Sequence, residues 1–256
     1  MKILYTIYVW IVLTATVLAW CSLLAIMLIF DRGKYSYPFM ARTWAGMVVF
    51  LTGVKVEISG LDKIPKGPAV YMANHQSYFD VISMGAFVPV APRYVAKRVL
   101  TYIPVFGQIL YLTGHIIIDR DDPRQAFGAL DRAAEKIKRG TSIYVFPEGT
   151  RSKDHKLGQF KKGGFVLAIK AGVPIVPISV TGTQSMMPKG KFSFKRPKLV
   201  RIAISDPVDG TSSQLDQRDR LMSETRKAMI RGFAPDTPEW KMNCADLEDP
   251  PAPNAA

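Results

Sequence analysis

The sequence contains few of the residues from which metal, redox and disulfide sites are built. Two cysteines and three histidines occur among 256 residues. Cys21 lies inside an apolar run and Cys244 lies near the other end of the chain, a separation that fits neither a zinc site nor a redox motif. No disulfide, metal or bound cofactor is therefore expected. The chain also lacks a Gly-x-Ser-x-Gly elbow, which excludes the usual serine nucleophile.

Acidic side chains are scarce in comparison with basic ones. The chain carries 34 Lys and Arg residues against 21 Asp and Glu, a formal net charge of +13. An excess of this size favours an anionic partner, such as a membrane surface, a phosphorylated substrate or a nucleic acid. No zinc-finger spacing or stacking-aromatic motif accompanies it, so no nucleic acid is expected and anionic lipid headgroups are preferred. The basic residues concentrate in two clusters, at 153–162 (Lys153, Lys156, Lys161, Lys162) and at 189–201 (Lys189, Lys191, Lys195, Arg196, Lys198, Arg201).

Charge is absent altogether between residues 3 and 30. As a helix this run is roughly 42 Å long, against about 30 Å for the hydrocarbon core of a bilayer. It is too long for a signal peptide, so it predicts a membrane anchor that either spans with tilt or enters and leaves again. Arg32, Lys34 and Arg42 follow the run and only Lys2 precedes it. The positive-inside rule then predicts a catalytic domain on the cytoplasmic face, of the inner or plasma membrane if the protein is bacterial.

A second apolar segment, 38–53, is shorter and is interrupted by Arg42. It is too short to span a bilayer comfortably. Two interpretations stay open: an interfacial or re-entrant helix beside the first, or a helix of the soluble core. Residues 1–53 are assigned to the membrane anchor, as one span or as a helix pair.

From residue 54 onward, short strands are expected to alternate with helices. The predicted strands are 54–58, 69–73, 93–96, 115–118, 143–146, 175–180 and 199–204. The predicted helices are 125–139, 165–171 and 213–232. This order indicates an α/β fold, with a mixed or largely parallel sheet flanked by helices, over a catalytic domain at 54–210. Residues 211–256 are expected to form a C-terminal helix and a frayed, disordered tail.

A histidine directly follows one of these strands, in residues 74–80, which read N-H-Q-S-Y-F-D. If the chain turns into a helix there, Asp80 can bind one ring nitrogen of His75 and leave the other free to take a proton from an alcohol. Alternatively, Asp80 caps a helix and His75 is a loop residue. Because the chain supplies no nucleophile, the alcohol would be the substrate's own.

A second motif, F-P-E-G-T-R-S at 146–152, follows another buried strand. Gly149 allows the backbone to approach a ligand closely, and exposed amides in such a turn favour anions. The planar guanidinium of Arg151 matches a phosphate with two hydrogen bonds, which is preferred to a surface salt bridge. Glu148 either binds substrate hydroxyls or braces Arg151 or the turn.

Together the two motifs resemble the glycerolipid acyltransferase family, in particular its 1-acylglycerol-3-phosphate acyltransferases, which pair N-H-x-x-x-x-D with F-P-E-G-T-R-S. Two weaker stretches also resemble family blocks, one within 96–120 (residues 96–97, 103–107, 114 and 118–120) and one at 173–180, and the resemblance extends over about 54–205. In the family, the lysine of the first stretch is often followed by Lys or Ser and then by Glu-Leu. In this chain Lys97 is followed by Arg98, Val99 and Leu100.

The resemblance implies an enzyme of phospholipid biosynthesis that transfers a fatty acyl group from acyl-CoA or acyl-carrier protein to the sn-2 hydroxyl of lysophosphatidic acid, giving phosphatidic acid. His75 and Asp80 would be catalytic. The substrate-binding residues would be Lys97, which joins Arg151 around the phosphate, and Glu148, Gly149 and Thr150. The alternatives are a related acyltransferase with another lysolipid or glycerol-3-phosphate as acceptor, and a non-catalytic protein that binds anionic membrane lipids.

Overall fold

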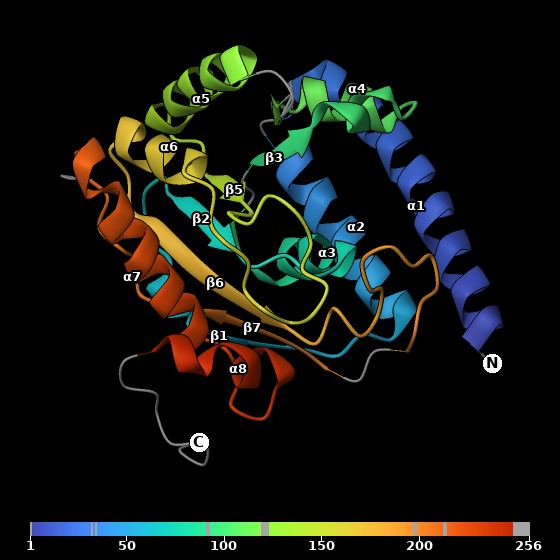
Figure 1. Ribbon diagram of the computed structural model, residues 1–256. Coiled ribbons are helices and arrows are strands. Elements are labelled where there is room, and N and C mark those ends of the chain that lie inside the picture. The colour runs from blue at the N-terminus through green and yellow to red at the C-terminus, as the bar shows by residue number, and fades with distance from the viewer. Residues whose placement is uncertain are drawn as a thin grey trace.

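A seven-stranded sheet with helices on both faces forms the centre of the protein (Figure 1). The strand order is β1-β7-β6-β2-β5-β3-β4, and all neighbours are parallel except β6 and β7, which are antiparallel. The mixed α/β sheet predicted from the sequence is thus confirmed. The computed structural model describes residues 2–31, 33, 35–90, 93–118, 123–196, 199–211 and 214–247, with 123–127 described by their backbone alone.

Each of the seven predicted strands is present, with ends that differ from the prediction by at most two residues. β2 and β6 are buried along their whole length, as expected of central strands with helices on both faces. The strands are β1 (Val56–Ser59), β2 (Val70–Ala73), β3 (Arg93–Lys97), β4 (Ile116–Ile118), β5 (Ile143–Val145), β6 (Ile175–Thr181) and β7 (Val200–Ile204).

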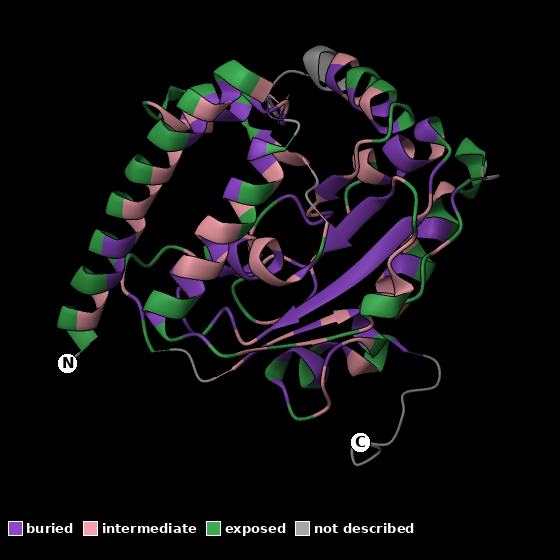
Figure 2. Ribbon diagram, turned by 180° about the vertical axis from the view of Figure 1, so that it is seen from behind, coloured by how far each residue is buried: buried purple, intermediate pink, exposed green. Residues whose placement is uncertain are grey.

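The helices divide between the two faces of the sheet. Because side chains alternate along a strand, Tyr71 of β2 packs in one core cluster with α1, α2 and α3, and Val70 packs in a second cluster with α5, α6 and α7. Figure 2 shows the strands buried between these layers. The helices are α1 (Lys2–Asp31), α2 (Ser36–Thr52), α3 (Tyr78–Phe87), α4 (Phe106–Leu112), α5 (Pro123–Lys138), α6 (Gly163–Ala171), α7 (Arg218–Arg231) and α8 (Pro238–Asn243).

The N-terminal helices form an antiparallel pair on one side of the molecule (Figure 1). Within the described residues, α1 is the one helix whose length and composition fit a membrane span. The second apolar segment forms α2, which packs against both α1 and α3. Val48 and Val49 lie in the core, whereas Phe39 and Phe50 are 62% and 82% exposed. The helix thus packs on the core with one face and exposes apolar side chains on another, and its place in a membrane interface stays a prediction.

The C-terminal region corrects the sequence analysis. The expected frayed tail is wrong for residues 238–247, because α8 buries Glu239, Trp240 and Asn243 against the body. Thr237 caps this short helix by accepting a hydrogen bond from the backbone N–H of Trp240. Residues 248–256, the remainder of the predicted tail, lie outside the described part of the chain, as do Arg32 and Lys34. The proposed boundaries at 53 and 210 stay predictions.

Candidate functional site

The two sequence motifs begin at the same edge of the sheet. β2 is paired in parallel with both β5 and β6, so Val70 lies level with Ile143 on one side and Ile175 on the other. The carboxyl ends of the three strands therefore lie together, and they continue into 74–80, 146–152 and the loop after Thr181. Open α/β sheets bind ligands outside this edge.

The predicted histidine–aspartate pair is present. Nδ1 of His75 lies 2.8 Å from Oδ2 of Asp80. An ionised carboxylate only accepts hydrogen bonds, so Nδ1 carries the proton and Nε2 is left with a free lone pair. The Asp80 side chain is completely buried and the His75 side chain is 17% exposed. The imidazole also stacks on the ring of Phe146, the first residue of the second motif, with centroids 4.1 Å apart.

Asp80 caps a helix as well as binding the imidazole of His75, and its catalytic role stays a prediction. It occupies the third position of α3 and forms a capping box with Ser77. Its Oδ2 accepts from the backbone N–H groups of Gln76 at 2.6 Å and Ser77 at 2.8 Å. Its Oδ1 accepts from the hydroxyl of Thr183, which follows β6. These bonds fix the carboxylate and hence the orientation of the imidazole.

Glu148 connects the second motif to the first. Oε1 accepts from the backbone N–H of His75 at 2.8 Å, and Oε2 accepts from the backbone N–H of Gly158 at 2.9 Å. The backbone N–H of Ser152 donates to the carbonyl of His75 at 2.7 Å. Burial raises the pKa of the Glu148 carboxyl, while the two N–H donors oppose that shift. Glu148 thus braces the backbone of His75 rather than Arg151, and its role toward substrate stays a prediction.

Arg151 lies over the first residue of α3. Its guanidinium carbon is 4.3 Å from the centroid of the Tyr78 ring. Its Nη1 is buried and has no hydrogen-bond partner among the residues that the structure describes. No ion pair to Arg151 occurs within those residues either, which disfavours the surface salt bridge. The donor capacity of this side chain is therefore available to an anion.

Gly149 occupies a position where other residues would be strained. Its φ is +71°, and a Cβ there would lie 3.0 Å from the Lys161 side chain. The next residue, Thr150, accepts a hydrogen bond from Nζ of Lys189 at 2.7 Å. Lys189 belongs to the second basic cluster, so this cluster contributes a cation to the site.

Two further basic residues have different surroundings. Lys97 is exposed at the carboxyl end of β3, the strand that lies beyond β5. Its part in phosphate binding stays a prediction. Arg201, at the end of the second basic cluster, is already paired, because its guanidinium is bonded to Glu57 and Asp236.

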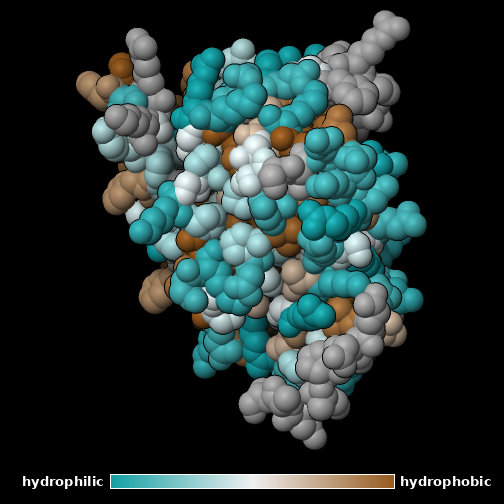
Figure 3. Space-filling model, turned by 90° about the vertical axis from the view of Figure 1, so that its left-hand side faces the viewer, coloured by the Kyte–Doolittle hydropathy of each residue, from teal (hydrophilic) through white to brown (hydrophobic). Residues whose placement is uncertain are grey.

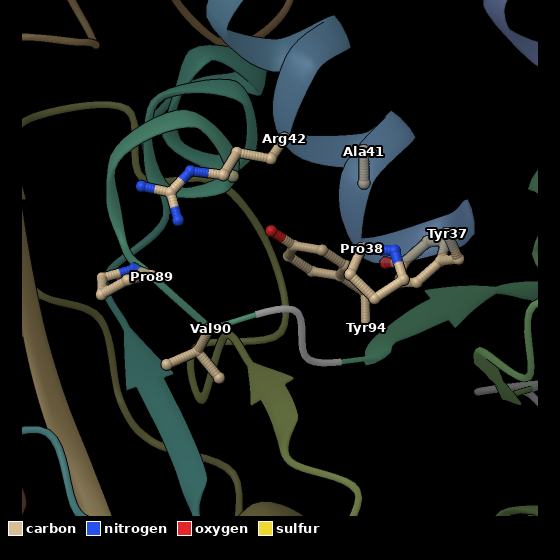
Figure 4. Close-up of a pocket in the computed structure, with 8 residues that line it drawn as sticks. Tyr37, Pro38, Ala41, Arg42, Pro89, Val90 and Tyr94 are labelled. Atoms are coloured by element: carbon tan, nitrogen blue, oxygen red, sulfur yellow. The ribbon is translucent and has the colours of Figure 1, made fainter. Parts of the chain in front are cut away.

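Four further residues contact the motif residues and were not predicted as parts of the site: Tyr78, Phe146, Thr183 and Lys189. Tyr78 and Phe146 lie inside the two motifs, Lys189 lies in the second basic cluster, and Thr183 follows a predicted strand, but the sequence pattern does not reveal the partner of any of them. A separate pocket lies between α2, α3 and β3 and contains none of the motif residues (Figure 4). Its lining residues are Tyr37, Pro38, Ala41, Arg42, Gly85, Pro89, Val90 and Tyr94.

The remaining histidines do not join this site. His115 is buried, accepts from the backbone N–H of Tyr94 at 2.9 Å and stacks on the Tyr94 ring, so it is a packing residue of the core. His155 lies in the loop after the second motif, with Nδ1 3.0 Å from Oε1 of the buried Glu239.

Across the part of the chain that the structure describes, fold and site together define an α/β protein in which a bonded histidine–aspartate pair and an arginine with an unpaired buried donor follow neighbouring strands of one sheet. The family model described as Acyltransferase matches residues 55–181, which include both motifs. A relative from Escherichia coli (strain K12), "1-acyl-sn-glycerol-3-phosphate acyltransferase", is 36% identical over 191 residues, 74% of this chain and 77% of that protein. The chain therefore belongs to the acyltransferase family.

Two other relatives extend the comparison. A Brassica napus protein, "1-acyl-sn-glycerol-3-phosphate acyltransferase BAT2, chloroplastic", is 38% identical over 194 residues, 73% of this chain. The chain spans 55% of that relative's length. The crystal structure of the 1-acyl-sn-glycerophosphate (LPA) acyltransferase PlsC from Thermotoga maritima is similar with a TM-score of 0.76 and 27% identity, over 89% of this chain and 94% of that one.

Proposed function

We propose that this protein is a 1-acyl-sn-glycerol-3-phosphate acyltransferase of phospholipid biosynthesis. It transfers a fatty acyl group from acyl-CoA or acyl-carrier protein to the sn-2 hydroxyl of lysophosphatidic acid and so forms phosphatidic acid. The observation that carries the proposal is the 2.8 Å contact between His75 and Asp80, which leaves Nε2 as a base in a site without a serine elbow. The similarity to relatives named as 1-acyl-sn-glycerol-3-phosphate acyltransferases supports the choice of acceptor.

The reaction is a direct transfer between two bound substrates. Nε2 of His75 takes the proton of the sn-2 hydroxyl while that oxygen attacks the thioester carbonyl carbon. The tetrahedral intermediate collapses, the carbon–sulfur bond breaks, and the proton on Nε2 passes to the departing thiolate. The products are the new ester and a free thiol, and His75 returns to its starting state. General base catalysis of this kind contributes about 10²–10⁴-fold.

The phosphate of the acceptor is assigned to the second motif. Arg151 supplies two donors from its fork, and the turn at Gly149 lets backbone amides approach the phosphate oxygens. Lys97 and Lys189 add positive charge near the carboxyl edge of the sheet, Lys97 at the end of β3 and Lys189 through its bond to Thr150.

The membrane is the second partner, and α1 is the principal contact with it. Large apolar side chains are exposed along the whole helix, from Ile3 at 75% to Phe30 at 83%. The face opposite α1, which carries α5, α6 and α7, is mostly hydrophilic (Figure 3). An exposed apolar helix on the side opposite a mostly polar face is suited to a lipid surface.

Both ends of α1 contact the body, which favours a re-entrant or interfacial helix pair. Near its start, Trp10 donates from Nε1 to the carbonyl of Phe192 at 2.9 Å. Near its end, Leu28 packs in one cluster with Ile109 of α4. A helix held at both ends by a domain on one side of the bilayer does not cross it. We propose that α1 and α2 enter and leave the same leaflet, with the catalytic domain on the cytoplasmic face.

A second apolar surface extends from the end of α1. It is formed by the 3₁₀ turn η2 (Arg98–Tyr102) together with α4, which packs against α1. We assign this surface to the membrane interface, where it brings the end of β3 and Lys97 to the level of the lipid headgroups. Its exposed side chains are Val99, Tyr102, Ile103, Tyr111 and Leu112.

The acceptor and donor are tested by presenting a panel of substrates to the purified protein. The panel combines acyl-CoA and acyl-carrier protein with lysophosphatidic acid, other lysophospholipids and glycerol-3-phosphate, and both thiol release and lipid product are measured. The proposal expects phosphatidic acid and the highest kcat/KM with lysophosphatidic acid. A higher kcat/KM with another acceptor would favour a sibling acyltransferase. Absence of thiol release with every pair would favour a non-catalytic lipid-binding protein.

A further inference from the structure

We infer that the C-terminal helices α7 and α8 position the catalytic histidine from outside the motifs, through Asn243 and Arg226. The inference rests on the proposed role of His75. Asn243 and Arg226 lie beyond residues 55–181, the part of the chain that matches the family model. They act on the 155–158 segment, which follows the second motif and leads back to Glu148.

The first link joins α8 to the 155–158 segment. The Asn243 side chain is 2% exposed and both of its polar atoms are used. Its Oδ1 accepts from the backbone N–H of Leu157 at 2.8 Å, and its Nδ2 donates to the carbonyl of His155 at 3.0 Å. Glu239, one turn earlier, bonds the His155 ring. A buried amide that bonds both a carbonyl and an N–H of one segment fixes that backbone in position.

The second link joins α7 to the same segment. Arg226 donates from Nη1 to the carbonyl of Gly158 and from Nη2 to the carbonyl of Leu157, both at 2.9 Å. Asp246, after α8, accepts from Nη2 at 2.7 Å and from Nε at 3.2 Å. Because the guanidinium is rigid and planar, these bonds hold the two carbonyls in one fixed geometry.

The third link passes from the segment to His75. The N–H of Gly158 donates to Oε2 of Glu148, and Oε1 of Glu148 accepts from the N–H of His75. Gly158 is packed closely, since a Cβ there would lie 3.1 Å from Oε2. Next to it, the N–H of Lys161 donates to the carbonyl of Pro147 at 2.7 Å. The chain of bonds from Asn243 to His75 is therefore continuous.

These bonds matter for catalysis because they fix the position of His75. His75 must present Nε2 to a hydroxyl held by other residues, and a misplacement of about 1 Å can cost about 100-fold in rate. Loosening the 155–158 segment lets Glu148 move, and with it the backbone of His75. Phosphate binding by Arg151 does not pass through these bonds, so the KM for lysophosphatidic acid is expected to change little.

The test compares Asn243→Leu and Arg226→Met with Thr225→Val in the full-length protein. Thr225 is a fitting control, because it is completely buried on α7 beside Arg226 and its hydroxyl has no partner among the described residues. We expect kcat to fall about 10-fold in the first two variants, with the KM for lysophosphatidic acid unchanged, and to stay at the wild-type value in Thr225→Val. Asn243→Asp, which keeps the acceptor for Leu157, is expected to restore part of kcat.

A double-mutant cycle separates positioning from loss of folded protein. If Asn243 acts through Glu148, then Asn243→Leu lowers kcat much less in a Glu148→Gln background than in the wild type. Fully additive effects on kcat, or a wild-type kcat per folded Asn243→Leu and Arg226→Met molecule, would overturn the inference. A different result, normal turnover by the His75→Ala variant, would contradict the proposed function itself. If Asn243→Leu does not fold, the same double-mutant cycle is measured with Asn243→Asp and with Arg226→Met.

Discussion

The backbone N–H of His75 donates to Oε1 of Glu148 at 2.8 Å, although the two residues are 73 positions apart in the chain. The glutamate of one motif thereby sets the position of the histidine in the other. The site is thus a single bonded unit, in which the loops that follow β2 and β5 hold each other. The contact shows Glu148 as a brace of the His75 backbone, and whether this side chain also binds substrate is a separate question.

Replacement of Glu148 by Gln tests that distinction. The amide keeps one acceptor but turns its NH₂ group toward a backbone N–H, so one buried donor is left unsatisfied at a cost of about 1–3 kcal/mol. We expect a lower melting temperature and a lower kcat, with the KM for lysophosphatidic acid unchanged. A raised KM with an unchanged kcat would instead make Glu148 a substrate ligand.

Replacement of Arg151 by Ala should mainly weaken acceptor binding. Hydrogen bonds to charged groups contribute about 1.5–3 kcal/mol, so the KM for lysophosphatidic acid is expected to rise about 10- to 100-fold. The matched control is Arg201→Ala, because the Arg201 guanidinium is already paired with Glu57 and Asp236. Equal effects of the two substitutions on KM would contradict a phosphate site at Arg151.

Much of this arrangement was predictable from the sequence, because it depends on patterns within short segments of the chain. The strands at 143–146 and 175–180 are short apolar runs whose burial leaves little choice of structure, and the motif residues follow such strands directly. The partners of those motif residues were not predictable, since Thr183 and Phe146 reach Asp80 and His75 only through the pairing of strands distant in sequence.

The C-terminal region was predicted wrongly for a similar reason. Residues 238–243 are too few for a helical pattern to be recognised, and their Pro and acidic content is typical of a tail. Glu239 and Asn243 become buried only because the 155–158 segment supplies partners for their side chains. Short helices of this kind depend on contacts with distant parts of the chain, and the residue pattern of a short segment does not reveal those contacts.

The surface formed by η2 and α4 is expected to touch the bilayer. A nitroxide label at Tyr111→Cys, in a Cys21→Ser, Cys244→Ser background, should be accessible to oxygen and shielded from a water-soluble nickel chelate in lipid vesicles. A label at Ile29→Cys on α1 should behave alike, and one at Glu135→Cys on α5 should be exposed to the chelate. Shielding at Ile29 without shielding at Tyr111 would restrict the membrane contact to the helix pair.

His115 should make the fold sensitive to acid. Burial, followed by the charges of Arg93 and Lys136, lowers the pKa of this imidazole from 6.5 to about 3. Between these values the unfolded chain binds a proton that the folded chain does not, so stability falls as the pH drops below 6.5, by about 2 kcal/mol at pH 5. His115→Asn keeps an acceptor for the N–H of Tyr94 and does not titrate, so the melting temperature of this variant should depend less on pH over that range. An equal dependence would assign the loss to other groups.

The most direct test is the rate at which purified, vesicle-bound His75→Ala forms phosphatidic acid from lysophosphatidic acid and acyl-CoA at saturation. Loss of the base at Nε2 predicts a kcat about 10²–10⁴-fold below that of the wild type, with the protein still folded and bound to the membrane. A kcat within about twofold of the wild type would contradict the role of His75 and the mechanism built on it.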